Sequence, residues 1–105
     1  MGGSLMNLAI QTVALACTGA LSAEHARHLL ASGGQLVDVR SPADFSRGAL
    51  PGALNIPVES LSYDHHLLSR EQPVIVYGAS EFRSSRAARL LAGHGFQRIY
   101  HLGKK

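Results

Sequence analysis

The stretch Pro73-Val74-Ile75-Val76-Tyr77, followed by the polar loop 78–82, decides the fold. Its first five residues form an unbroken apolar run with β-branched residues at the centre. Such a run is typical of a central parallel strand that is covered on both faces. After the loop, the apolar spacing predicts a helix over 83–93. This strand–loop–helix unit is the core of the predicted domain.

Upstream of this unit, strand and helix signals alternate. Ser22 is the expected N-cap of a helix that Gly33-Gly34 ends, and a short apolar strand follows over 36–39. Ser41 is the expected cap of a second short helix, with Pro42 at its first position. The alternation predicts one α/β domain with a small parallel sheet and helices on both faces.

The remaining elements complete the pattern. A small strand is expected over 53–56, a helix over 60–69 and a last strand over 96–102. Ligands of parallel sheets bind outside the carboxyl ends of the strands, and the loop after Tyr77 lies at such an end. The sequence therefore directs attention to that loop.

Composition sets limits on the kind of partner. The chain has 105 residues and a formal net charge of +3, without blocks of basic residues, so no nucleic-acid partner is expected. The only cysteine is Cys17, which excludes an intramolecular disulfide and favours a cytoplasmic protein. No cofactor and no metal site are expected, and the six histidines are expected at the surface.

The first twenty residues are expected to form an N-terminal extension, separate from the domain over 21–105. Its apolar part, 8–16, is too short to span a bilayer and lacks a basic residue before it, so no membrane association is expected. The preferred interpretation is a buried first strand. Residues 1–5 are open to a second interpretation, as a remnant of cloning.

The loop and the following helix start have the features of an anion cradle. A helix N-terminus offers unpaired N–H groups and a partial positive charge, and Arg83 adds a cationic side chain. Glu81 acts against an anionic guest. The candidate anion-binding residues are Gly78, Ala79, Ser80, Glu81, Phe82, Arg83 and Ser84. The alternative is an ordinary strand-to-helix turn with an arginine-rich solvated face.

Three ordered motifs make the sequence resemble the rhodanese-like domains. The stretch 36–45 (LVDVRSPADF) resembles their opening signature, and 48–57 (GALPGALNIP) resembles their second signature. The strand 73–77 with Arg83-Ser84 and 87–91 (AARLL) resembles their active-site strand, loop and helix. The resemblance runs from about Leu21 to Gly103 and implies a rhodanese-like fold.

The resemblance also implies a chemistry that this chain lacks the residue to perform. The family carries sulfane sulfur as a persulfide on a cysteine five positions before the arginine of the loop. Counting back from Arg83 gives Gly78, and the usual loop glycine is Glu81 here. We therefore expect no catalytic residue and no sulfurtransferase activity. The expected role is a binding or regulatory module.

Two alternatives remain open. In one, the chain is a thiosulfate or persulfide sulfurtransferase whose cysteine was replaced deliberately at position 78. In the other, it is a structural subunit or interaction module. The partner would be a protein or a small sulfur oxyanion or phosphate.

Three residues are expected to flank the site. Asp38 and Arg40 resemble the family's Asp-x-Arg pair and are expected to be structural, and Arg47 is expected in a solvated position. The sequence stops without the closing helix that family members commonly have. One face of the sheet would then be less covered. Because uncovered apolar faces often cause self-association, a homodimer is one of the expected states.

Overall fold

The computed structural model describes residues 22–102 and contains one sheet of four parallel strands. The strands are β1 (Gln35–Asp38), β2 (Leu54–Asn55), β3 (Val74–Tyr77) and β4 (Ile99–His101), in the order β2-β1-β3-β4. β1 and β3 occupy the centre and pair along their whole length, from Gln35 with Val74 to Asp38 with Tyr77. The predicted parallel sheet is confirmed.

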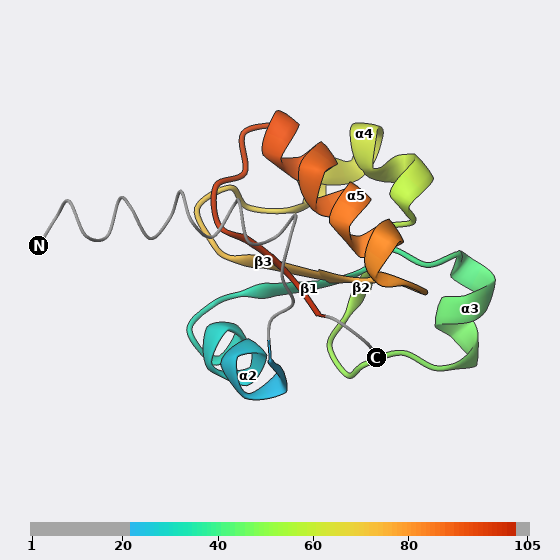
Figure 1. Cartoon of the computed structure of the whole chain (residues 1–105), viewed down its shortest axis with the longest axis horizontal. Coiled ribbons are helices and arrows are strands. Elements are labelled where there is room, and N and C mark those ends of the chain that lie inside the picture. The colour runs from blue at the N-terminus through green and yellow to red at the C-terminus, as the bar shows by residue number, and fades with distance from the viewer. Residues whose placement is uncertain (1–21, 103–105) are drawn as a thin grey trace, which may run out of the picture.

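Helices cover both faces of this sheet, as predicted. Figure 1 shows α2 (Ala23–Ala31) on one face, and α4 (Leu61–Asp64) with α5 (Glu81–Gly93) on the other. The helix α3 (Pro42–Arg47) stands beyond the end of the sheet, before β2. Two short 3₁₀ turns, η1 (Val58–Ser60) and η2 (His65–Leu67), flank α4.

The central strands are apolar throughout because both of their faces are buried. Val37 and Val76 point to the α5 face and pack with Ala87 and Leu91, among others. On the α2 face, a second cluster contains Ala26, Leu36, Ile75 and Tyr77. Each side chain of β3 is at most 1% exposed. Two-sided burial thus accounts for the continuous run that the sequence shows at 74–77.

Serine caps fix where the helices start. The hydroxyl oxygens of Ser22 and Ser41 accept hydrogen bonds from the backbone N–H groups of His25 and Asp44, at 3.2 Å each, as the sequence predicts. At the other end of α2, Gly33 has φ +105°, which a residue with a side chain rarely adopts. The backbone N–H of Gly34 then donates a hydrogen bond to the carbonyl of Leu29 at 2.8 Å, and this contact ends the helix.

The predicted helix over 83–93 is wrong at its start, since α5 begins at Glu81. The reason is a third cap, because the hydroxyl oxygen of Ser80 accepts from the N–H of Arg83 at 3.3 Å. The polar connection is consequently only three residues long, 78–80, and Glu81 belongs to the first turn of the helix.

Two other predicted elements are shorter than expected. Of the helix predicted over 60–69, α4 covers Leu61–Asp64 and the 3₁₀ turn η2 covers His65–Leu67. After η2, Gln35 exchanges two hydrogen bonds with the backbone of Ser69, which therefore does not continue the helix. The last strand starts at Ile99, because the N–H of Phe96 bonds the carbonyl of Leu91 at the end of α5. The first strand predicted within 1–20 lies outside the described residues.

Two glycines at the end of α5 predict opposite responses to substitution. Gly93 has a backbone that accepts a side chain, and a Cβ there would meet nothing within 4 Å. Gly93→Ala is expected to raise the free energy of unfolding by about 0.5–1 kcal/mol, since alanine favours the helix and restricts the unfolded chain. Urea denaturation followed by circular dichroism measures the change.

Gly95→Ala is the matched control. Gly95 has φ +93°, and a Cβ there would lie 3.2 Å from Nε of Arg70. The substitution is expected to lower the free energy of unfolding by about 1 kcal/mol or more. Equal effects of the two alanines would contradict this account of the helix end.

Candidate functional site

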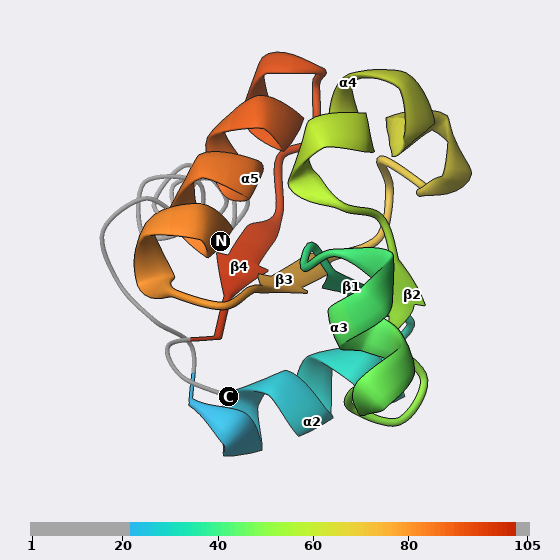
Figure 2. The ribbon, with the colours of Figure 1, turned by 90° about the vertical axis from the view of Figure 1, so that its right-hand side faces the viewer.

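The candidate site lies at the carboxyl edge of the sheet, where β3 runs through Gly78–Ser80 into α5. The connection can be followed in Figure 2, which also shows α3 beside the same edge. Ser80 organises this turn with both of its oxygens. Its hydroxyl accepts from the N–H of Arg83 at 3.3 Å, and its carbonyl accepts from the N–H of Ser84 at 3.1 Å. The loop and the first helical turn are therefore one compact unit.

A side chain at position 78 would point into this unit. A Cβ built on Gly78 would lie 3.6 Å from Cβ of Arg83 and 3.7 Å from the backbone nitrogen of Ser84. Its tightest contact would be Cγ2 of Val39 at 3.1 Å, which requires a shift of a few tenths of an ångström. Position 78 thus faces the N-terminal turn of α5, the place where the helix dipole favours negative charge.

The predicted loop residues differ in what they offer to a ligand. Ala79, Ser80, Glu81, Phe82 and Arg83 are all exposed, and Phe82 is 71% exposed. Glu81 and Arg83 place opposite charges in the first turn of α5. Any anion held there meets the N–H groups and the guanidinium together with a nearby carboxylate, so the site favours a small or weakly charged guest.

Ser84 is the exception among these residues, because its side chain is fully buried. Its hydroxyl donates to the carbonyls of Ser80 and Glu81, at 3.3 and 3.1 Å. The hydroxyl proton is thereby committed within the helix. Ser84 stabilises the start of α5 and offers a ligand no free donor from its side chain.

Asp38 and Arg40 form a buried ion pair at the end of β1. Nε and one terminal nitrogen of Arg40 bond the Asp38 carboxylate at 2.8–3.1 Å, and the backbone N–H of Arg40 adds a bond of 2.9 Å. The Asp38 side chain is 0% exposed and the Arg40 side chain 15%. Burial acts to raise the pKa of Asp38, but the hydrogen bonds from Arg40 outweigh it and lower the pKa below the usual value.

This pair connects neighbouring segments. The same guanidinium of Arg40 donates to the carbonyl of Gly48 at 2.6 Å and lies 5.8 Å from the ring centre of Tyr77. The Tyr77 hydroxyl oxygen accepts from the N–H of Leu50 at 2.9 Å. Burial raises the pKa of that hydroxyl, so it stays protonated at neutral pH. These contacts bind the loop after α3 to the ends of β1 and β3.

Arg47 lies apart from this network. One of its guanidinium nitrogens contacts Oδ1 of Asp44 at 2.6 Å, and its side chain is 74% exposed. It pairs within α3, a solvated contact of small energetic value.

The sequence did not identify His101, and the prediction that the histidines lie at the surface is wrong for it. His101 is 2% exposed, and neither ring nitrogen has a hydrogen-bond partner among the described residues. It ends β4, opposite Val76 of β3, at the same edge of the sheet as the loop. Its position two residues after buried Ile99 is the signal that could have placed it inside, because residues i and i+2 of a strand share a face.

Two further histidines are half-buried. The rings of His65 and His94 stack with centres 4.0 Å apart, and the edge of Phe96 packs against His65. Burial and the neighbouring His94 lower the pKa of His65. Within residues 22–102, no three His, Cys, Asp or Glu side chains gather as the ligands of a metal ion would. None of the helices in that range is long and apolar enough to cross a membrane.

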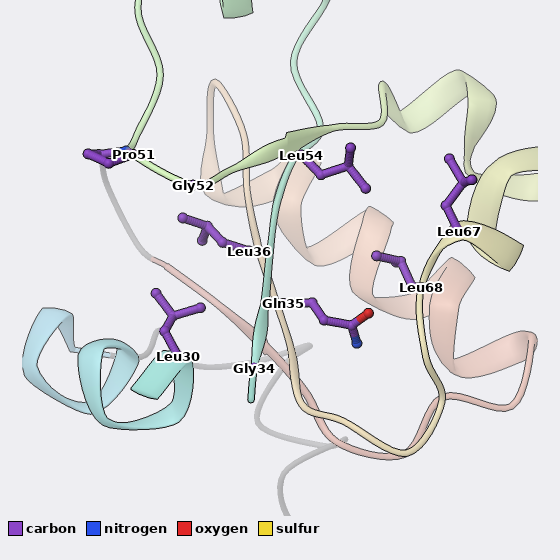
Figure 3. A pocket seen from close by; sticks show the side chains of 9 residues that line it. All are labelled: Leu30, Gly34, Gln35, Leu36, Pro51, Gly52, Leu54, Leu67 and Leu68. Carbon is purple, nitrogen blue, oxygen red and sulfur yellow. The ribbon is translucent and has the colours of Figure 1, made fainter. Parts of the chain in front are cut away.

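A separate cavity of about 330 Å³ lies at the amino end of β1, away from the loop (Figure 3). Its walls are mainly leucines from α2, β1, β2 and the end of η2: Leu30, Leu36, Leu54, Leu67 and Leu68. The polar group of Gln35 beside it is already bonded to the backbone of Ser69. The cavity therefore presents apolar surface without a free polar anchor.

Comparison with known proteins supports the fold and the motifs. The family model for the rhodanese-like domain matches residues 22–104. The chain belongs to the rhodanese-like family. The sequence is 32% identical to thiosulfate sulfurtransferase GlpE of Ectopseudomonas mendocina, over 78% of this chain and 75% of that protein.

Two further relatives extend this comparison. Uncharacterized protein YqhL of Bacillus subtilis is 40% identical over 65% of this rhodanese-like chain, which spans 54% of YqhL. Among solved structures, the human single domain sulfurtransferase TSTD1 has a TM-score of 0.70 and 28% identity, covering 80% of this chain and 88% of that one. Residues 22–102 thus have the fold of proteins named as sulfurtransferases.

Removing the carboxylate of the buried pair is expected to destabilise this domain strongly. Asp38→Asn leaves the Arg40 cation without its partner, and the free energy of unfolding is expected to fall by about 3 kcal/mol. Because the pKa of Asp38 is lowered in the folded protein, its contribution is complete above the usual aspartate pKa of 3.8 and is lost as the pH falls through the lower, folded value.

Urea titrations of both proteins at several pH values measure this effect. The wild-type protein is expected to lose part of its stability on acidification below pH 4, and Asp38→Asn is expected to show a smaller loss over the same range. Parallel pH profiles would contradict the assignment of this acid sensitivity to Asp38.

His101→Leu is expected to leave stability unchanged or to increase it by about 1 kcal/mol. The imidazole is buried without hydrogen bonds, and replacing it by an apolar side chain of similar size removes its desolvation cost. Denaturant unfolding tests this, with His25→Leu on the exposed face of α2 as control. A loss of more than about 1 kcal/mol would show that the imidazole has a partner in solution.

Proposed function

We propose that this rhodanese-like domain binds a ligand or partner at the loop after β3 and does not itself carry sulfur. The observation behind this proposal is Gly78, at the position where the family's motif has its cysteine. Persulfide transfer requires a thiolate, and glycine has no side chain. The surrounding features are present, since position 78 faces the capped N-terminus of α5.

No other described residue of the loop replaces the thiol. A serine hydroxyl does not form a persulfide, and the hydroxyl of Ser84 is buried and bonded inside the helix. Cys17 lies outside the described residues. The relatives named as sulfurtransferases support a common fold, and the glycine separates this chain from their chemistry.

The favoured small ligand is an oxyanion such as thiosulfate, sulfate or phosphate. Support comes from the N-terminal turn of α5 and from the exposed guanidinium of Arg83. Glu81 lowers the expected affinity. A regulatory or binding role in the cytoplasm suits a chain with one cysteine.

A second candidate is a sulfurtransferase in which a cysteine was replaced by glycine at position 78. The backbone favours this alternative, because Gly78 is not among the glycines with positive φ. A Cβ there would need a shift of a few tenths of an ångström by the Val39 methyl group. The codon for residue 78 in the source gene decides between the two, and a natural glycine codon ends this alternative.

Sulfur transfer from thiosulfate to cyanide tests the main proposal. The wild-type protein and Cys17→Ser are both expected to show no turnover above the uncatalysed rate. Gly78→Cys introduces a thiol that faces the helix N-terminus. Its thiolate is expected to take the outer sulfur of thiosulfate, with release of sulfite, and to form a persulfide detectable by mass spectrometry. The double variant Gly78→Cys/Cys17→Ser is the control that assigns the persulfide to position 78.

Turnover by Cys17→Ser with glycine at position 78 would overturn the proposal. Anion binding is tested separately by titrating wild-type protein with thiosulfate, sulfate and phosphate while amide shifts are recorded by NMR. Shifts confined to 79–85 are expected, and Arg83→Gln is expected to reduce them. An unchanged spectrum would remove the oxyanion from the proposal.

A further inference from the structure

The outward face of α5 carries an unusual group of side chains that the loop does not use. Phe82, Arg86 and Arg89 fall at helical positions i, i+4 and i+7, so they share one stripe within a sector of about 60°. The buried residues of the same helix, Ala87, Ala88 and Leu91 among them, occupy the opposite side. We call the three residues 82, 86 and 89 the α5 stripe.

All three members of the α5 stripe are exposed. Phe82 is 71% exposed, although burial of a phenyl ring away from water is energetically favourable. Figure 2 shows α5 at the outside of the molecule, with its first turn next to the connection from β3. The stripe therefore begins two residues after Ser80 and continues away from the loop for about 10 Å.

The arginines of α5 have no acidic partner among the described residues. The ion pairs within 4 Å in residues 22–102 are Asp38 with Arg40 and Asp44 with Arg47. The helix itself contains three arginines and one acid, Glu81, which lies outside the stripe. The stripe thus combines one exposed aromatic ring with two unpaired guanidinium groups, the residue types that most often dominate protein interfaces.

We infer that the α5 stripe docks an acidic protein segment, one apolar side chain of which packs on Phe82 while its carboxylates pair with Arg86 and Arg89. This inference rests on the proposed binding role and names the chemistry of the partner. Charge complementarity identifies the partner as acidic, because guanidinium groups bind carboxylates in a bidentate manner. A segment seated on the stripe, which begins two residues after Ser80, therefore lies next to the loop.

A nucleic acid fits the same surface less well. Phosphate chains need a broad basic track, and this stripe offers two cations along one helix. The neighbouring elements η1 and α4, which pack against α5, contribute the acids Glu59 and Asp64. Neither element contains a Lys or Arg, so neither extends the basic surface as a polyanion would need, whereas a short acidic segment needs only the stripe.

The end of the stripe is open as well. Gly93 follows at position i+11 of the same face, and no atom lies within 4 Å of the place where its Cβ would stand. A partner backbone can approach α5 closely there. The stripe therefore has an exposed aromatic ring at one end and an unobstructed glycine at the other.

Binding of a defined peptide tests the inference. The probe is a short synthetic helical peptide with glutamates one turn apart and one leucine, and its control has glutamine at each glutamate. We expect the glutamate peptide to bind wild-type protein at least about tenfold more tightly than the glutamine peptide, with affinity that falls as salt is raised. Amide shifts are expected at the residues of the stripe.

Matched variants assign the contact. Arg86→Glu and Arg89→Glu together are expected to weaken binding at least about tenfold, and Arg27→Glu on the opposite face is expected to have no effect. Phe82→Ala is expected to weaken binding, whereas Tyr63→Ala, which removes another exposed ring, is not. Circular dichroism of each variant shows that the fold is retained.

Several results would overturn the inference. They are equal affinity for the two peptides, no measurable binding of either, an equal effect of Arg27→Glu, or tighter binding of an oligouridylate RNA than of the peptide. The sulfur-transfer assay reports on position 78, and the peptide titration reports on the α5 stripe. Turnover in the assay above and loss of peptide binding are therefore separate results, and each proposal can fail without the other.

Discussion

The carboxylate of Asp38 is buried at the end of β1, and four donor contacts from Arg40 neutralise it. A buried charge is tolerable only with such compensation, so the Arg40 side chain must lie against the Asp38 carboxylate in the folded protein. The guanidinium then reaches the carbonyl of Gly48, while Asn55 donates to the backbone carbonyls of both Asp38 and Arg40, at 3.0 Å each. One ion pair consequently sets the path of the chain between β1 and β2 and fixes the edge of the sheet beside which the loop lies.

This scaffold does not depend on the residue at position 78. Gly78 contributes no side chain to either core cluster, and the cap of α5 uses Ser80. The fold therefore forms without a side chain at position 78. Exposed residues around the loop, such as Phe82, belong to neither core cluster and can change in the same way.

The central elements were predictable because their signals are local and strong. The apolar run at 74–77 and the caps at Ser22 and Ser41 required no knowledge of tertiary contacts. The start of α5 was predicted two residues too late. Serine is a good N-cap, and both Ser80 and Ser84 lie near the start of the helix, so the sequence alone does not show that Ser80 is the cap. The end of the helical segment after η2 depends on Gln35, a residue distant in sequence, which bonds the backbone of Ser69. The burial of His101 depends on which face of β4 meets α5, and the cavity of leucines depends on how four separate segments meet.

The all-parallel sheet has a consequence for the order in which the chain becomes structured. Its pairings join Val37 to Leu54, Gln35 to Val74 and Val74 to Ile99, so none of them closes through a short hairpin. During synthesis, Leu36 and Val37 leave the ribosome long before β3 exists to cover one side of them. The nascent chain therefore carries β1 without its central partner β3 until most of the domain has been made, and the centre of the sheet assembles late.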